Sequence, residues 1–124
     1  MNQAGTMRAL VIVAHGSRRA SSNDEVRALT DMIRPQAKTF DQVQCAFLEL
    51  AEPSIPDGIN AAIAAGAREV VVLPYFLSAG RHVVEDIPGF VAESQQAHPE
   101  VTIRIAPYLG TASDLPQTLL NLAK

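Results

Sequence analysis

The chain has 124 residues, a formal net charge of −3 and 48% hydrophobic residues, which together predict one globular domain spanning 1–124. The weak negative charge and the lack of a Lys/Arg-rich run argue against nucleic acid as a partner. No apolar run approaches the roughly 20 residues that span a bilayer. Residues 1–6 are polar, lack the layout of a signal peptide and are expected to form a flexible extension. We therefore expect a cytoplasmic protein without a membrane partner.

The single cysteine, Cys45, limits the thiol chemistry of the chain. One thiol cannot form a disulfide within the chain, and it cannot supply a zinc site of several thiolates. Because Cys45 stands in the apolar run 43–48, we expect it to be buried and unreactive.

Four short apolar runs predict the strands of the domain. Each run is nearly continuous rather than alternating, as in parallel strands that are covered on both faces. Segments with helical spacing separate the runs, and this alternation is typical of an α/β fold. We therefore predict a four-stranded parallel sheet with right-handed crossovers and helices on both faces. The predicted strands are 9–14, 43–48, 69–73 and 101–106.

Four segments with apolar residues at spacings of three and four predict the helices. Asn23 is a plausible N-cap of the first helix, and Pro56 falls in the first turn of the second, which ends at Gly66. Pro88 interrupts the third segment, so we expect a short turn near Val83 and the main helix from about residue 88. The predicted helices are 23–38, 56–65, 83–96 and 112–123, the last with Leu115, Leu119 and Leu122 on one side.

Polar residues directly follow the first two strands, where ligands bind in folds of this kind. His15 comes straight after the first strand, and Gly16 lets the backbone turn and approach a ligand closely. Ser17, Arg18 and the following Arg19 offer hydrogen-bond donors and positive charge for acidic groups. A hydrogen-bonded histidine in an ordinary polar loop is the alternative interpretation.

Glu49 follows the second strand, and its carboxylate is expected in the same cleft as His15. The alternative role for Glu49 is a solvated loop charge or a partner for a helix terminus.

The segment after the third strand combines large apolar residues with a basic tip. Such a segment suits a flat, hydrophobic macrocycle that carries peripheral acids. Alternatively, its apolar residues fold into the core or meet a partner subunit. A domain of this size buries a small share of its surface, so a large cleft is expected to need a partner. The segment comprises Tyr75, Phe76, Leu77, Ser78, Ala79, Gly80, Arg81 and His82.

Two acidic residues follow His82 at helical spacing. Glu85 and Asp86 stand three and four residues on, where either could orient the imidazole. For Asp86 we favour the alternative that it caps the helix beginning near Pro88. His98 precedes the fourth strand, at the opposite edge of the sheet, and is predicted to be a surface histidine.

Several catalytic motifs do not occur in the sequence. The P-loop, the G-x-G-x-x-G turn and the G-x-S-x-G elbow are all missing, so no nucleotide cofactor is expected. Histidine phosphatases carry Arg directly before their His-Gly, whereas Ala14 stands at that position here. Phosphoryl transfer through His15 is therefore a distant hypothesis.

Three stretches of the chain resemble the small sirohydrochlorin chelatases, the short cobaltochelatase class of the type II chelatases. They are 13–18 (VAHGSR), 47–49 with 52–54 (FLE and EPS), and 73–83 with 86–88 (LPYFLSAGRHV and DIP). The resemblance extends over about residues 8–108, and its third stretch is long and specific.

This resemblance implies a chelatase-like, flavodoxin-like fold and the insertion of a divalent metal, most readily Co²⁺ and alternatively Fe²⁺ or Ni²⁺, into sirohydrochlorin. It also implies a homodimer that holds the tetrapyrrole in its cleft, in cobalamin or siroheme biosynthesis. By position, His15 and His82 would bind the metal and accept pyrrole protons, and Glu49 could assist them. Neutral imidazole suits all three metals and titrates near neutrality. The alternative is a non-catalytic carrier of tetrapyrrole or metal that uses the same cleft.

Overall fold

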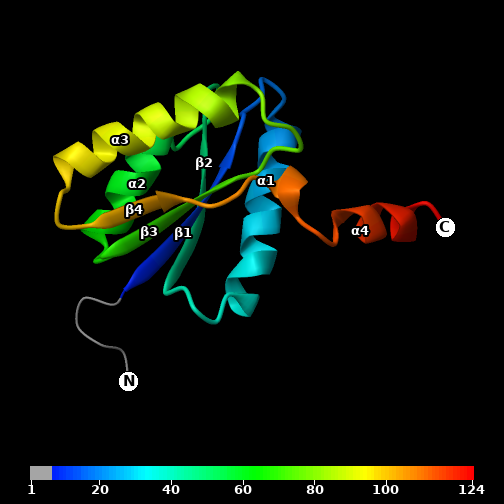
Figure 1. Ribbon diagram of the computed structural model, residues 1–124, viewed down its shortest axis with the longest axis horizontal. Coiled ribbons are helices and arrows are strands. Elements are labelled where there is room, and N and C mark those ends of the chain that lie inside the picture. Colours follow the sequence, from blue (N-terminus) through cyan, green and yellow to red (C-terminus); the bar gives the residue numbers. More distant parts are fainter. Residues whose placement is uncertain (1–6) are drawn as a thin grey trace.

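A four-stranded parallel sheet runs through the centre of the computed structural model, which describes residues 7–124 (Figure 1). Its strands are β1 (Arg8–Ala14), β2 (Gln42–Phe47), β3 (Glu69–Pro74) and β4 (Thr102–Ile105). Their order in the sheet is β2-β1-β3-β4, and every neighbouring pair is parallel. The predicted α/β fold with four parallel strands is confirmed. The prediction of a flexible extension concerns residues 1–6, which lie outside the described part of the chain.

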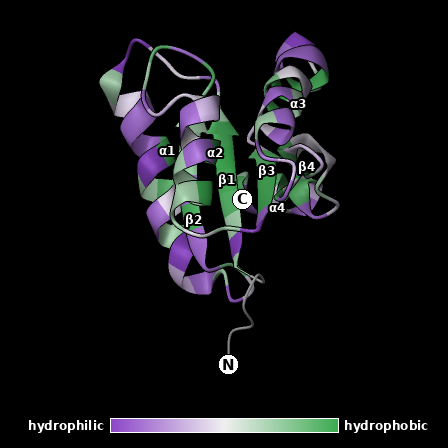
Figure 2. Cartoon of the chain, turned by 90° about the vertical axis from the view of Figure 1, so that its left-hand side faces the viewer, coloured by the Kyte–Doolittle hydropathy of each residue, from purple (hydrophilic) through white to green (hydrophobic). Residues whose placement is uncertain are grey.

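β1 occupies the middle of the sheet and is buried almost throughout. Val11 and Val13 join the apolar cluster on one face, whereas Leu10 and Ile12 join the cluster on the other. Successive side chains of a strand point to opposite faces, so a strand covered on both sides is apolar at every position. Figure 2 shows the strands as mainly hydrophobic, with hydrophilic residues concentrated on the helices.

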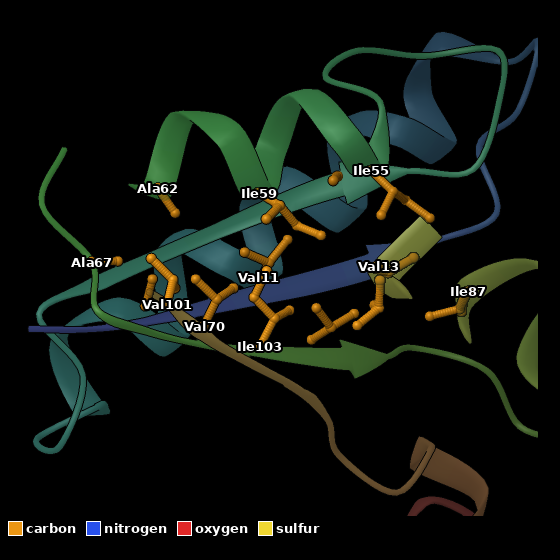
Figure 3. Packing of buried hydrophobic residues seen from close by; sticks show 14 residues of the cluster. Val11, Val13, Ile55, Ile59, Ala62, Ala67, Val70, Ile87, Val101 and Ile103 are labelled. Atoms are coloured by element: carbon orange, nitrogen blue, oxygen red, sulfur yellow. The ribbon is translucent and has the colours of Figure 1, made fainter. Parts of the chain in front are cut away.

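Helices α2 (Ile55–Ala64) and α3 (Ile87–Ala97) cover one face of the sheet. α2 begins after Ser54, whose side-chain oxygen accepts a hydrogen bond from the backbone N–H of Asp57. Ile55 and Ile59 project from α2 into the apolar cluster (Figure 3) and are almost completely buried. Burial of each such side chain contributes about 1.5–3 kcal/mol, so the apolar side of α2 holds it on the sheet.

Helix α1 (Ala20–Ile33) covers the other face, and a 3₁₀ turn extends it over Arg34–Gln36. Val26 packs against the cluster that contains the fully buried Phe47. The prediction that Asn23 caps this helix is wrong. The capping position is Arg19, and Asn23 lies inside the helix with its side chain buried.

A π-helical turn, His82–Asp86, precedes α3 and runs directly into it. The predicted short turn near Val83, followed by a helix from about residue 88, agrees with this arrangement. π-helical turns are rare and occur frequently at functional sites.

The last helix, α4 (Leu115–Leu122), extends away from the rest of the molecule (Figure 1). A 3₁₀ turn, Leu109–Thr111, separates it from β4. The sequence predicted a helix with an apolar side here, but that side does not pack on the sheet. Leu119, Leu120 and Leu122 are 57%, 63% and 79% exposed.

Cys45 is buried, as predicted. Among the described residues, none of the helices combines the length and the hydrophobicity that crossing a membrane requires.

Glu69, the first residue of β3, binds two arginines. They lie at the edge of the sheet opposite to the carboxyl ends of the strands. Its carboxylate oxygens lie 2.8 Å from Nε of Arg8 and 3.3 Å from Nε of Arg104. The hydrogen bond from Arg8 is the largest cause that lowers the pKa of Glu69 below its ordinary value, and Arg104 adds to it, although burial acts in the opposite direction.

Replacement of Glu69 by glutamine is expected to lower the free energy of unfolding at neutral pH by about 1 kcal/mol or less. Because the pKa of Glu69 is lower in the folded state, this stabilisation is present above the unfolded-state pKa and is lost as the pH falls through the folded-state value. Urea denaturation of the wild type and the variant between about pH 7 and pH 2.5 measures the effect. A stability difference that stayed constant down to the acid end would contradict it.

Candidate metal-binding and catalytic site

The carboxyl ends of β1 and β3 bring two histidines together. His15 directly follows β1, and His82 follows the loop after β3. β1 and β3 are parallel neighbours, so their ends lie at the same edge of the sheet. The ring centroids of the two histidines are 4.8 Å apart, with the planes at 61°. The two histidines that the sequence analysis assigned to one site therefore lie side by side.

Glu49 lies beside His15, with its Oε2 3.4 Å from the Nε2 of the imidazole. The other ring nitrogen, Nδ1, lies 2.9 Å from the carbonyl oxygen of Gly16. Because a carbonyl oxygen only accepts, we assign the ring hydrogen to Nδ1, which turns the lone pair of Nε2 toward the Glu49 carboxylate. The lone pairs of His15 Nε2 and Glu49 Oε2 then face each other. A cation between them, either a proton or a metal ion, can accept electron density from both atoms.

Backbone contacts fix this arrangement of His15 and Glu49. The N–H of Leu48 donates to the carbonyl oxygen of Ala14 at 2.9 Å, and the N–H of Glu49 donates to that of His15 at 3.1 Å. Gly16 has a φ of +93°, and a Cβ there would overlap the carbonyl oxygen of Glu49. Glycine is therefore required where the two loops meet.

Asn23 holds the loop after His15 from its buried position in α1. The backbone N–H of Ser17 donates to Asn23 Oδ1 at 3.0 Å, and Asn23 Nδ2 donates to the carbonyl oxygen of Ser17 at 2.8 Å. The side chain thus satisfies both backbone groups of a predicted ligand-binding residue. The sequence singled out Asn23 but gave it a different role, because an N-cap and a loop anchor use the same residue type.

Asp86 orients His82 within the π-helical turn. Its Oδ2 lies 2.7 Å from the Nδ1 of His82, at a sequence separation of four residues. Asp86 occupies the N-cap position of α3, as favoured from the sequence, but its side chain makes no capping hydrogen bond. The side chain instead binds His82, which was the alternative interpretation. Because a carboxylate accepts the hydrogen on Nδ1, the lone pair of Nε2 remains available to a ligand.

The apolar segment after β3 divides into a packed part and an exposed part. Phe76 packs against the core, and its ring centroid lies 6.4 Å from that of His82. Tyr75 is 38% exposed and Leu77 is 69% exposed. The other predicted ligand-binding residues of the segment, Ser78, Ala79, Gly80 and Arg81, are all exposed.

Arg18 and Arg19 on the loop after β1, and Arg81 before His82, are also exposed. None of the three forms an ion pair with a carboxylate among residues 7–124. Their guanidinium groups are thus free to meet an acidic ligand. Within the same described residues, no set of three or more His, Cys, Asp or Glu side chains is arranged to hold a metal ion.

The fold and the site define an α/β domain with paired imidazoles, each next to a carboxylate, at the carboxyl edge of a parallel sheet. Comparison with known families agrees with this description, since the chain matches the CbiX family over residues 9–124. The chain therefore belongs to the CbiX family.

Relatives in this family carry two kinds of name. The chain is 37% identical over 109 residues to the chloroplastic sirohydrochlorin ferrochelatase of Arabidopsis thaliana, covering 88% of this chain and 48% of that protein. It is 39% identical over 82 residues to the sirohydrochlorin cobaltochelatase of Methanococcus aeolicus, covering 66% of this chain and 57% of the relative. The chain thus matches only about half of the length of these relatives.

Two solved structures share the fold. The CbiX protein from Marinobacter aquaeolei VT8 superimposes with a TM-score of 0.77 at 29% identity, covering 94% of this chain and 93% of the other. The sirohydrochlorin chelatase SirB from Bacillus subtilis subspecies spizizenii, in complex with cobalt, gives a TM-score of 0.84 at 27% identity. That match covers 93% of this chain but 49% of SirB.

Proposed function

We propose that the chain is a metal chelatase that inserts a divalent metal ion into sirohydrochlorin. The observation that supports this most directly is the contact between His15 and His82 at 4.8 Å, with Glu49 beside the first and Asp86 beside the second. The names of the relatives, sirohydrochlorin cobaltochelatase and ferrochelatase, agree with the same reaction. Co²⁺ is the first candidate metal and Fe²⁺ the second, while Ni²⁺ stays a prediction from the donor set.

The donor atoms suit a metal that is held and then handed on. Atoms 3.4 Å apart, such as Nε2 of His15 and Oε2 of Glu49, can both lie about 2.1 Å from one ion, at an angle close to tetrahedral. The ring of His82 lies beside this pair and would take part when the ion moves on, since the described residues place no three such side chains around one point. His15 and Glu49 are 44% and 56% exposed, so the ion can reach the site and leave it without rearrangement of the core.

The proposed reaction exchanges one dication for two protons. Two nitrogens of the tetrapyrrole lose their N–H protons when they bind the metal, and these protons need acceptors. Each Nε2 lone pair is released when the metal moves to the pyrrole nitrogens, and it can then bind one proton. Glu49 beside His15 and Asp86 beside His82 would stabilise the two imidazolium charges, so protons and charges balance within the site.

The rest of the site would position the substrate. Arg18, Arg19 and Arg81 are free to bind its peripheral carboxylates, while Tyr75 and Leu77 offer an apolar surface for the ring. We further propose that two copies form a homodimer around the tetrapyrrole, since the chain covers only about half of the Arabidopsis ferrochelatase and of SirB. Cytoplasmic location also stays a prediction.

The test is insertion of Co²⁺, Fe²⁺ and Ni²⁺ into sirohydrochlorin, followed by absorbance with and without the protein. A chelatase accelerates insertion over the spontaneous reaction, and competition between the metals ranks them. A protein that binds both metal and tetrapyrrole without any acceleration would be a carrier, and the proposed catalysis would be wrong.

Asp86→Asn is expected to lower kcat about 10–100-fold, in line with the loss of other groups that orient a metal-binding histidine. Asparagine keeps the size of the side chain, but its NH₂ group can donate to Nδ1 and move the hydrogen to Nε2. Steady-state insertion rates and Co²⁺ titrations measure the effect, with Glu85→Gln as a control on the same turn. Recovery of activity in Asp86→Glu would support orientation of His82, whereas equal rates in Asp86→Asn and the wild type would exclude it.

A further inference from the structure

The last helix of the chain carries an apolar side that its own domain leaves uncovered. Leu115, Leu119 and Leu122 recur at spacings of four and three, which places them on one face of α4. Leu119 and Leu122 are 57% and 79% exposed, and α4 projects beyond α1 (Figure 1). Exposed leucines on an ordered helix usually mark a surface that another element covers.

A groove lies between α1 and the residue that follows β3. It has a volume of about 480 Å³ and an apolar floor of Val26, Leu29 and Met32, which share one face of the helix, with Tyr75 at the end of β3. Met32 is 64% exposed. On this face of the sheet α1 provides the helical cover, and Leu73 of β3 remains half-buried. Parallel sheets normally carry helices across both faces, so the groove lies where a further helix is expected.

The segment between β4 and α4 directs the helix away from its own groove. The N–H of Ala106 donates to the carbonyl oxygen of Val72 at 2.8 Å, and that of Gly110 donates to Phe76 at 3.0 Å. A Cβ at Gly110 would overlap the carbonyl oxygen of Leu77. These contacts anchor the chain up to the 3₁₀ turn and thereby set the direction in which α4 leaves.

We propose that α4 of one chain packs into the α1 groove of a second copy, and that the two copies exchange these helices reciprocally. Every chain carries both the helix and the groove, so a two-fold pair covers all of these apolar surfaces at once and leaves nothing for a third copy. Glu25 lines the groove and Lys124 follows α4, so the two surfaces carry residues of opposite charge. The exchange depends on the proposed dimer and not on the metal chemistry.

The exchange would also connect the dimer to the site. The incoming α4 would pack against Tyr75, which precedes the exposed loop leading to His82. The partner copy would thus supply the apolar wall that completes the surface beside the histidine pair.

Cross-linking between two different variants distinguishes exchange from a helix that folds back onto its own chain. Met32→Cys and Leu119→Cys chains, each with a different tag, are refolded together and oxidised with diamide. Exchange is expected to give a disulfide-linked product at twice the 13.3 kDa chain mass that carries both tags. The control pairs Met32→Cys with Gln117→Cys, since Gln117 lies on the opposite side of α4, and this pair should give at least several-fold less product.

Two results would overturn the exchange. In the first, Met32→Cys and Leu119→Cys chains give no more cross-linked product than the control pair, while the double variant Met32→Cys/Leu119→Cys forms its disulfide within a single chain. The other is a wild type that is monomeric by light scattering.

Leu119→Ser/Leu122→Ser should raise the protein concentration at which half of the dimer dissociates at least about tenfold, whereas Thr118→Ser should not. Metal insertion is measured separately, so a cross-linked dimer without activity would refute only the proposed chelatase.

Discussion

His82→Ala is expected to lower the rate of metal insertion into sirohydrochlorin at least about 100-fold, the usual contribution of a positioned general base. The variant removes one of the two Nε2 lone pairs at the site and leaves Asp86 with no imidazole to bind. His15→Ala should cause a loss of similar size, because it removes the donor 3.4 Å from Glu49. Both variants should still fold, since these side chains are 44% and 40% exposed and not part of the core.

His98 provides a matched control for these variants. It lies at the other edge of the sheet, where its Nε2 is 3.1 Å from Oδ1 of Asn60, so His98→Ala should retain the wild-type rate. The double variant His15→Ala/His82→Ala should be little slower than either single variant, because residues that act as one unit are not additive. Full activity in both single variants would show that the chemistry takes place elsewhere.

Gly16→Ala is expected to destabilise the fold by about 2–4 kcal/mol, since the new methyl group meets a backbone oxygen at a left-handed φ. The φ of Gly16 is +93°, and the overlap is with the carbonyl oxygen of Glu49. The loops after β1 and β2 must then separate, which displaces His15 from Glu49. We therefore expect weaker Co²⁺ binding even at temperatures where the variant remains folded.

Urea denaturation and Co²⁺ titration of the variant measure the two effects. Gly89→Ala is the control, because a Cβ there has no heavy atom within 4 Å in the described structure. Alanine is the better helix former, so this control should leave stability unchanged or raise it by up to about 1 kcal/mol. If Gly16→Ala unfolded at the same urea concentration as Gly89→Ala, the close contact between the two loops would be wrong.

Local sequence patterns determined the elements of the fold and the position of its chemistry. The apolar runs at 9–14 and 69–73 identified strands covered on both faces, because such strands cannot carry polar side chains on either side. Once the strands are parallel, the residues after them must meet at one edge. This constraint makes His15 and His82 candidates for one site from the sequence alone, and the motif around His82 is typical of the family to which the chain belongs.

The partners of individual side chains followed only from the tertiary structure. Asn23 and Asp86 both precede or enter helical segments, and the sequence favoured capping for each. In the fold, Asn23 binds the backbone of Ser17 and Asp86 binds His82. The choice between a cap and such a partner depends on where the helix begins and on what lies across a loop, and neither is encoded within a few neighbouring residues.

The last helix, α4, also shows which features follow from the local sequence and which follow from the tertiary structure. The sequence determined that α4 is a helix with one apolar side, because the spacing of its leucines is a local property. Only the tertiary structure decided that this side faces away from its own sheet, through the anchoring of Gly110 against the loop at Leu77. Local spacing selects the type of an element, whereas contacts between distant segments decide which surface it covers.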